Sequence, residues 1–264
     1  MARFCPLFSG SSGNSYYIGS ASAGVLIDAG RTAKQMVAML DLCGIEMGAV
    51  KAIFVTHEHS DHVKGLRVLA SRYHIPVYSS CGTLGALEEM GCLAGNFQSN
   101  VIEEAGMECA GMYIQPFHTS HDSAESVGYR IQTHDGRNVG ISTDLGYMSD
   151  EVRSALCGAD LVVLESNHDI GMLNNGPYPY PLKKRILSAT GHLSNLACAE
   201  ELCGLAEKGT VRFVLAHLSS ENNTPELAYQ TAFCSLTLAG LKPEADFDLS
   251  VAPKENITGK ITIF

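Results

Sequence analysis

The sequence is short of positive charge, and this shortage limits the partners that the protein can bind. Its 264 residues contain 18 Lys and Arg against 28 Asp and Glu, which gives a net charge of −10 at pH 7. Such a balance argues against indiscriminate binding of nucleic acid through bulk charge. It leaves room for a local basic or metal-centred site that handles a phosphodiester. Because 45% of the residues are apolar, the chain is not a disordered protein.

Long apolar runs and paired cysteines are also missing. No run approaches the ~18–20 apolar residues of a membrane helix, and the opening MARFCPLFSGSSGNS lacks the apolar core of a signal peptide. The nine cysteines include no C-x-x-C pair, so we interpret them as reduced thiols. These features predict a cytoplasmic protein without a membrane partner.

The chain shows no repeat, low-complexity tract or long linker, which predicts one domain over residues 1–264. Helical periodicity and short apolar runs predict an alternation of helices and strands, with strands alone over 101–142. Predicted strands lie at 14–20, 23–30, 51–57, 75–80, 159–166 and 211–217, and two more follow 247. Predicted helices lie at 32–44, 64–74, 82–91, 151–158, 182–190, 194–208 and 224–240. This mixture favours an α/β layered sandwich over a doubly wound sheet.

The motif THEHSDH follows the apolar run at 51–56 and concentrates metal-ligand side chains. It supplies His57, His59, Asp61 and His62 within six positions. Imidazole and carboxylate suit Zn²⁺, Mn²⁺ or Fe²⁺, and a strand end is a rigid place to fix them. Since four ligands in one loop cannot all reach one ion, we expect two ions that are completed from elsewhere. The candidates elsewhere also follow predicted strands: His121, Asp144 and His217.

These residues resemble the motifs of the metallo-β-lactamase superfamily, whose first signature is H-x-H-x-D-H. The resemblance implies an αββα four-layer sandwich with a dinuclear site. It assigns one ion to His57, His59, His121 and Asp144, and the other to Asp61, His62, Asp144 and His217. Asp144 would bridge the two ions. Asp28, in VLIDAG, matches an early Asp that orients the first metal loop.

Three features indicate the branch of the superfamily. Asp144 takes a place that is Cys in some lactamases, and His59 takes a place that is a carboxylate in diiron flavoproteins, so hydrolysis is favoured. The stretch GHLSN at 191–195 is similar to ribonuclease Z, where a His before a helix serves phosphodiester cleavage. The resemblance makes His192 the candidate that protonates the leaving oxygen or holds the phosphate. Ser194 would cap the helix or touch phosphate.

Longer stretches resemble the YycJ family, which is also called WalJ or VicX. They include FSGSSGNSYYI (8–18), THEHSDHVKG (56–65), STDLGY (142–147), LESNHD (164–169) and YPYPLKKRILSATGHLSN (178–195). No β-CASP insertion fits between Asp144 and His217. The resemblance implies 5′→3′ exonuclease action on double-stranded DNA. Further candidate substrate contacts are Asn167 and His168, after a buried strand, and Lys184 in a local basic cluster.

A water shared by two divalent ions would lose a proton near pH 7 and attack phosphorus, with Asp61 as ligand and orienting group. Alternative functions are a ribonuclease, a hydrolase of small phosphodiesters or thioesters, and a metal-stabilised regulatory protein with little turnover. A regulatory protein would need no leaving-group His192, so the hydrolases are favoured. The sequence does not choose between zinc, manganese and iron, and it leaves the oligomeric state open.

Overall fold

The structure is a computed structural model that describes residues 1–264. The chain divides into two compact units. Unit 1 comprises Met1–Pro116, Ser123–Arg137 and Pro253–Phe264, and unit 2 comprises Phe117–Asp122 and Asn138–Ala252. Each unit is therefore assembled from stretches that are distant in the sequence. The expectation of a single domain stays a prediction.

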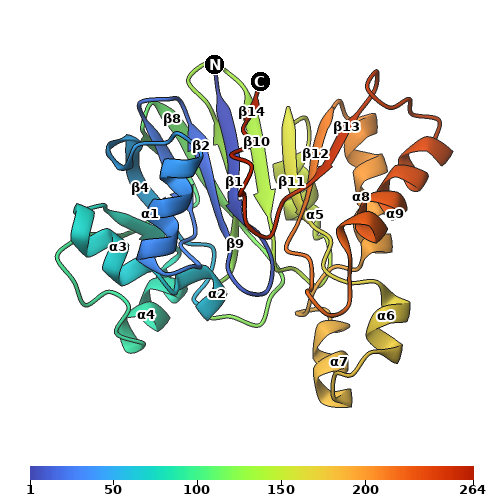
Figure 1. The fold of residues 1–264 in the computed structure, drawn as a ribbon, viewed down its shortest axis with the longest axis horizontal. Coiled ribbons are helices and arrows are strands. Elements are labelled where there is room, and N and C mark those ends of the chain that lie inside the picture. The colour runs from blue at the N-terminus through green and yellow to red at the C-terminus, as the bar shows by residue number, and fades with distance from the viewer. The chain divides into compact units, whose positions relative to one another are not determined.

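Unit 1 contains a mixed sheet of seven strands in the order β14-β1-β2-β3-β4-β5-β6 (Figure 1). The strands β14, β1, β2 and β3 pair in antiparallel fashion, and β3 to β6 pair in parallel. Their bounds are β1 (Arg3–Phe8), β2 (Ser15–Gly19), β3 (Gly24–Ile27), β4 (Val50–Phe54), β5 (Val77–Ser79), β6 (Ser99–Val101) and β14 (Thr262–Ile263). Three more strands begin in this unit: β7 (Met107–Cys109), β8 (Met112–His118) and β9 (Val127–Gln132). The predicted strands at 14–20, 23–30, 51–57 and 75–80 correspond to β2 to β5.

Helices cover one face of the unit 1 sheet. They are α1 (Ala33–Leu42), the 3₁₀ turn η1 (Met47–Ala49), α2 (Ser60–Val63), α3 (Leu66–Tyr73) and α4 (Cys81–Glu89). Thr32 and Gln35 form a capping box that starts α1, since each side chain accepts a backbone N–H of the other residue. The buried side chains of Leu26 and Ile53 pack with Leu40 and Leu69 in one apolar cluster. This burial holds the helices against the strands.

Unit 2 contains parallel strands in the order β13-β12-β11-β10. Their bounds are β10 (Asn138–Ser142), β11 (Leu161–Glu165), β12 (Arg212–Ala216) and β13 (Asp248–Val251). The helices are α5 (Asp150–Leu156), α6 (Ile170–Asn175), α7 (Tyr180–Ile186), α8 (Asn195–Glu207) and α9 (Pro225–Leu238). All residues of β11 are buried, which explains why the strand is a continuous apolar run in the sequence.

The sequence prediction missed the helix α6 and gave different bounds for the helix α7. The helix α6 was not predicted, because it is short and rich in Asn and its start depends on the Asp169 side chain, which accepts the Met172 N–H at 2.8 Å. The predicted helix 182–190 begins earlier, at Tyr180, because Pro179 and Pro181 suit the first turn of a helix, and it ends at Ile186. None of the helices is both long enough and apolar enough to traverse a lipid bilayer.

The carboxyl ends of the parallel strands carry most of the predicted ligands. In unit 1, Asp28 follows β3 and His57 follows β4, and the register pairs Ile27 with Phe54. In unit 2, Glu165 is the last residue of β11 and pairs with Ala216, directly before His217. Since parallel strands end at one edge of a sheet, this register brings the side chains that follow them together.

A close backbone approach fixes the loop after β3 against the metal motif. A Cβ atom on Gly30 would lie 1.8 Å from the carbonyl oxygen of Asp61, so the position has room only for glycine. The Asn14 N–H donates to the same Asp61 carbonyl at 2.8 Å, and the Gly30 N–H donates to the Asn14 carbonyl at 2.9 Å. Three segments of unit 1 therefore lock the backbone at Asp61.

Candidate metal centre

Unit 1 gathers the four predicted ligands of the THEHSDH motif. The ring centroid of His57 lies 4.6 Å from that of His59 and 4.1 Å from that of His62. The Asp61 carboxylate lies 3.7 Å from the Nε2 atom of His62, and its side chain is 24% exposed. His59 forms the N-cap of α2, which contains Asp61 and His62. The motif is thus a strand end followed by one short helical turn.

Asp28 holds two of these histidines in one orientation. Its fully buried carboxylate accepts the Nδ1–H of His62 at 2.8 Å and both the N–H and the hydroxyl of Thr56 at 2.8 Å. Because the Thr56 hydroxyl donates to Asp28, it accepts the Nδ1–H of His57 at 3.0 Å. Both imidazoles therefore keep their lone pair on Nε2. The positioning role predicted for Asp28 would use these contacts, and it stays a prediction.

Burial is the largest influence on Asp28. It raises the pKa of the carboxyl, while the charge of His62 and the hydrogen bonds from His62 and Thr56 act in the opposite direction. A buried carboxylate is tolerated only when its oxygens are hydrogen-bonded, and here both oxygens have donors.

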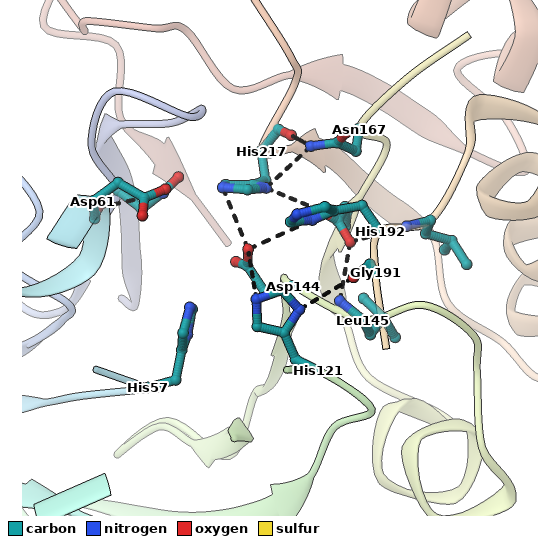
Figure 2. Close-up of polar contacts among 12 residues, drawn as sticks. His57, Asp61, His121, Asp144, Leu145, Asn167, Gly191, His192 and His217 are labelled. Carbon is teal, nitrogen blue, oxygen red and sulfur yellow. Dashed lines mark hydrogen bonds and ion pairs between the residues drawn. The ribbon is translucent and has the colours of Figure 1, made fainter. Parts of the chain in front are cut away.

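Unit 2 brings the other predicted residues together around Asp144 (Figure 2). The Asp144 Oδ1 atom lies 3.5 Å from the Nε2 atom of His217, 3.9 Å from that of His121 and 3.7 Å from the Nδ1 atom of His192. His121 donates its Nδ1–H to the Gly191 carbonyl at 3.1 Å. The side chains of His121 and His217 are almost fully buried, whereas His192 is partly exposed. A carboxylate thus faces three imidazoles.

Glu165 organises this cluster, and the sequence prediction did not include it. Its Oε1 atom accepts the Nδ1–H of His192 and the Nδ1–H of His217, each at 2.8 Å. Its Oε2 atom accepts the backbone N–H groups of Leu145 at 3.0 Å and Leu193 at 3.1 Å. One carboxylate therefore connects the loops that carry Asp144, His192 and His217. The only sequence signal was an acidic residue at the end of an apolar strand.

Glu165 and His192 stabilise each other's charged forms, and each therefore shifts the pKa of the other. Burial alone would raise the pKa of Glu165, but the charge of His192 and the hydrogen bonds from His192 and His217 lower it to about 2. Burial would lower the pKa of His192, but the Glu165 charge and hydrogen bond outweigh that effect and raise it. His192 is therefore suited to carry a proton near neutral pH.

Three site residues adopt a left-handed backbone conformation that is rare outside glycine. The φ angles are +62° for Asp28, +59° for Asp144 and +55° for His217. Each residue lies just beyond a strand, where the left-handed turn redirects the chain. Such conformations cost about 1–3 kcal/mol each and cluster at functional sites. Asp and His are among the residues that tolerate them best.

The predicted substrate contacts have different surroundings. Ser194 caps α8, because its hydroxyl accepts the Ala197 N–H at 3.2 Å. Asn167 donates its amide to the His217 carbonyl at 2.9 Å. His168 is 1% exposed, neither ring nitrogen has a hydrogen-bond partner, and burial lowers its pKa to about 4. Lys184 lies on the exposed surface of α7. Their roles toward substrate stay predictions.

The donor atoms fit divalent metal ions. In unit 2, ligand-type atoms of Asp144, Glu165, His192 and His217 lie within 4.8 Å of one another. Glu165 already accepts four hydrogen bonds, so we assign it to positioning. Four other histidines have Nδ1 bonded to an oxygen, which puts the lone pair on Nε2: His57, His62, His121 and His217. This is the usual arrangement of histidines that bind metals. The Nε2 atom of His62 also lies 3.1 Å from the Asn14 amide, a contact that a metal ion would replace.

We expect the change Asp28→Asn to weaken metal binding by roughly 10–100-fold. The amide group of Asn presents a donor to the Nδ1–H of His62 or to the Thr56 hydroxyl, so one imidazole loses its fixed orientation. Competition with a chromophoric chelator measures the affinity for Zn²⁺ and Mn²⁺. Asp41→Asn, on the exposed surface of α1, is the matched control and keeps the wild-type affinity. Equal affinities in the two variants would refute the role of Asp28.

We expect Glu165→Gln to lower the free energy of unfolding of the chelator-treated protein by roughly 1–3 kcal/mol. A Gln amide cannot accept the N–H groups of Leu145 and Leu193 while its oxygen faces the two histidines. Denaturant unfolding measures the change. The exposed Glu200→Gln on α8 is the control, with a change within about 0.5 kcal/mol. If the two variants unfold alike, the Glu165 network does not stabilise unit 2.

Known proteins resemble this chain over most of its length. The family model described as "Beta-lactamase superfamily domain" matches residues 24–218. The exodeoxyribonuclease YycJ of Bacillus anthracis is 39% identical over 86% of this chain and 86% of its own. The exodeoxyribonuclease WalJ of Streptococcus pneumoniae is 37% identical over 93% of this chain and 92% of its own.

A solved structure supports the fold. The metallo-β-lactamase fold protein YhfI from Bacillus subtilis matches with a TM-score of 0.73 and 15% identity over 99% of this chain and 98% of its own. The expected α/β fold of two mixed sheets flanked by helices is thereby confirmed, as is the expected class of metal-dependent hydrolase. The chain belongs to the β-lactamase superfamily and, within it, to the YycJ/WalJ family.

Proposed function

We propose that this protein is an exodeoxyribonuclease that uses two divalent metal ions to degrade double-stranded DNA from the 5′ end. The observation that carries the proposal is the His192–Glu165 pair beside Asp144, in a chain 39% identical to the exodeoxyribonuclease YycJ. A metal site alone would serve many hydrolases. A histidine beside Asp144 whose pKa is raised by Glu165 would supply what phosphodiester cleavage also needs, a proton for the leaving oxygen.

The proposed ligand sets are those implied by the family. His57, His59, His121 and Asp144 would hold one ion, and Asp61, His62, Asp144 and His217 would hold the other. The hydrogen bonds of Asp28, Thr56 and Glu165 support this assignment, because they engage the Nδ1 atoms of His57, His62 and His217 and put the lone pair on Nε2. Zinc and manganese both suit imidazole and carboxylate ligands, and iron is a third candidate.

Bound divalent ions would supply an activated water and neutralise the charge that builds on the phosphate oxygens. The protein residues do the remaining work. The Asp61 carboxylate, the more exposed of the acidic ligands, would orient the attacking water. His192 would donate its Nε2 proton to the leaving oxygen, since Glu165 holds its Nδ1–H at 2.8 Å. Glu165 would keep that imidazole charged until the proton leaves.

The choice of DNA as substrate rests on the named relatives, and with it we propose a cytoplasmic location. The acidic surface favours a narrower alternative, a hydrolase of small phosphodiesters, because a net charge of −10 repels a long polyanion. The two functions differ in the size of substrate that reaches the same ligands.

End-labelled single- and double-stranded DNA and RNA, incubated with Mn²⁺ or Zn²⁺, test the proposal. We expect nucleotides to leave duplex DNA in order from the 5′ end, and chelator to abolish the reaction. Cleavage of bis-p-nitrophenyl phosphate without any cleavage of DNA would favour the small-substrate alternative. RNA cleavage alone would indicate a ribonuclease. Full metal occupancy with no turnover would indicate a regulatory protein.

We expect His192→Ala to slow DNA cleavage by on the order of 10²–10⁴-fold and to leave both metal ions bound. The variant removes the proton donor but none of the proposed ligands. Single-turnover rates and elemental analysis measure the two effects. The exposed His134→Ala in unit 1 is the matched control and keeps the wild-type rate. Loss of metal from His192→Ala would instead make His192 a ligand.

A further inference from the structure

The short helix α7 presents an exposed stripe of one aromatic, one cationic and one apolar side chain. Tyr180 is 78% exposed and Leu187, at its carboxyl end, is 48% exposed. Lys184 lies between them on the exposed surface. Tyr180 and Lys184 are four residues apart, so their side chains share one face of the helix at about 5–6 Å between Cβ atoms. A large exposed ring has no packing role in the folded chain.

Lys184 is the one cation of the local basic cluster that is left to face solvent. Lys183 donates its Nζ protons to the carbonyls of Asn174 and Gly176, each at 2.8 Å. Arg185 forms a two-pronged ion pair with Asp122, at 2.5 and 2.7 Å. No hydrogen bond or ion pair holds the Lys184 ammonium. The Lys184 ammonium attracts anions, and the exposed Tyr180 ring next to it can stack on an aromatic group. In a protein of net charge −10, this pair therefore suits an anionic ligand that carries aromatic groups.

The stripe is presented rigidly. Pro177, Pro179 and Pro181 alternate with Tyr178 and Tyr180, and proline fixes the backbone φ angle near −65°. The Lys183 contacts tie the first turns of α7 to the chain before it. An exposed ring on a fixed backbone loses little entropy when it binds, so it makes a good contact surface.

The same helix is built directly onto the catalytic loops of unit 2. The His192 N–H donates to the Ile186 carbonyl at 2.9 Å, and a Cβ atom on Gly191 would lie 2.2 Å from the same oxygen. In the loop of Asp144, a Cβ atom on Gly146 would lie 2.3 Å from the Ala189 backbone. Figure 1 shows α6 and α7 beyond one end of strands β11 and β12. The carboxyl end of α7 is therefore packed against the loops that carry Asp144 and His192.

We propose that Tyr180 stacks on a base of the DNA strand that enters the site, while Lys184 binds a neighbouring phosphate. The inference rests on the proposed function and adds a substrate contact to it. Stacking on tyrosine tolerates any base, which suits an exonuclease that must advance through all sequences. The contact also supplies local affinity that the acidic protein lacks in bulk, since one cation and one ring can act where the overall charge repels.

The test measures binding of the metal-loaded enzyme to a phosphorothioate-linked duplex with a single-stranded 5′ end, which resists cleavage. We expect Tyr180→Ala to raise Kd by roughly 5- to 100-fold and Tyr180→Phe, which keeps the ring, to stay close to wild type. Lys184→Ala lowers the slope of log Kd against log salt concentration by about 1, whereas Tyr180→Ala leaves the slope unchanged. 2-Aminopurine in the single-stranded end reports stacking, because its fluorescence is quenched by wild type and not by Tyr180→Ala.

Leu238→Ala and Lys242→Ala are the controls, since both side chains are exposed outside the proposed site. We expect both variants to bind DNA as wild type does. The inference is overturned if Tyr180→Ala and Tyr180→Phe weaken DNA binding equally, or if Tyr180→Ala binds DNA as wild type does. The proposed function still holds in either case, provided that the wild-type enzyme cleaves DNA. A change in the sedimenting mass of Tyr180→Ala with no change in Kd assigns the stripe to a protein contact and also overturns it. Wild-type enzyme that neither binds nor cleaves DNA overturns both proposals.

Discussion

Two buried carboxylates, one in each unit, orient four histidines of the candidate site. Asp28 accepts the Nδ1–H of His62 and, through the Thr56 hydroxyl, fixes His57. Glu165 accepts the Nδ1–H groups of His192 and His217 on a single oxygen. An imidazole that donates from Nδ1 has its lone pair on Nε2, so the carboxylates choose which nitrogen a metal can reach. The orientation of these candidate ligands is therefore set by the carboxylates behind them.

Such carboxylates are costly to bury, and the fold compensates for them locally. Asp28 has donors on both oxygens, and Glu165 receives four hydrogen bonds, two of them from backbone N–H groups. A buried charge without these donors would be neutralised or would destabilise the protein. The same hydrogen bonds join loops that are far apart in the sequence. The atoms that donate hydrogen bonds to the buried carboxylates thus also fix the orientation of the candidate ligands.

The chemistry of the unit 2 cluster follows from the different surroundings of its histidines. His217 and His121 are buried with Nε2 near Asp144, which suits ligands. His192 is partly exposed, and the Glu165 charge raises its pKa, which suits a proton donor. His168, close by in sequence, is buried without partners, and its pKa falls to about 4. Burial and the neighbouring charges thus shift the pKa of His168 and that of His192 in opposite directions.

The sequence by itself determined most of the strands, the candidate site residues that follow them and the family. Apolar runs mark β4, β10 and β12, and His57, Asp144 and His217 lie just beyond their ends, so the ligand types and the metal class could be predicted from local pattern. The sequence also shows the basic cluster at 183–185, but not which of its side chains form hydrogen bonds or ion pairs within the protein. The missed residue, Glu165, has no local signature, because an acidic residue at a strand end is commonplace.

Only the tertiary structure decided the contacts of these side chains. Glu165 meets His217 because the register of β11 and β12 pairs Glu165 with Ala216, and it meets His192 because the chain returns through Gly191 after α7. Lys183 and Arg185 are held by protein groups, and Lys184 is left to face solvent. Hydrogen bonds between distant segments depend on strand register and loop path, and a one-dimensional pattern contains neither. Residue identity fixes what a group can do, and packing fixes which partner it has.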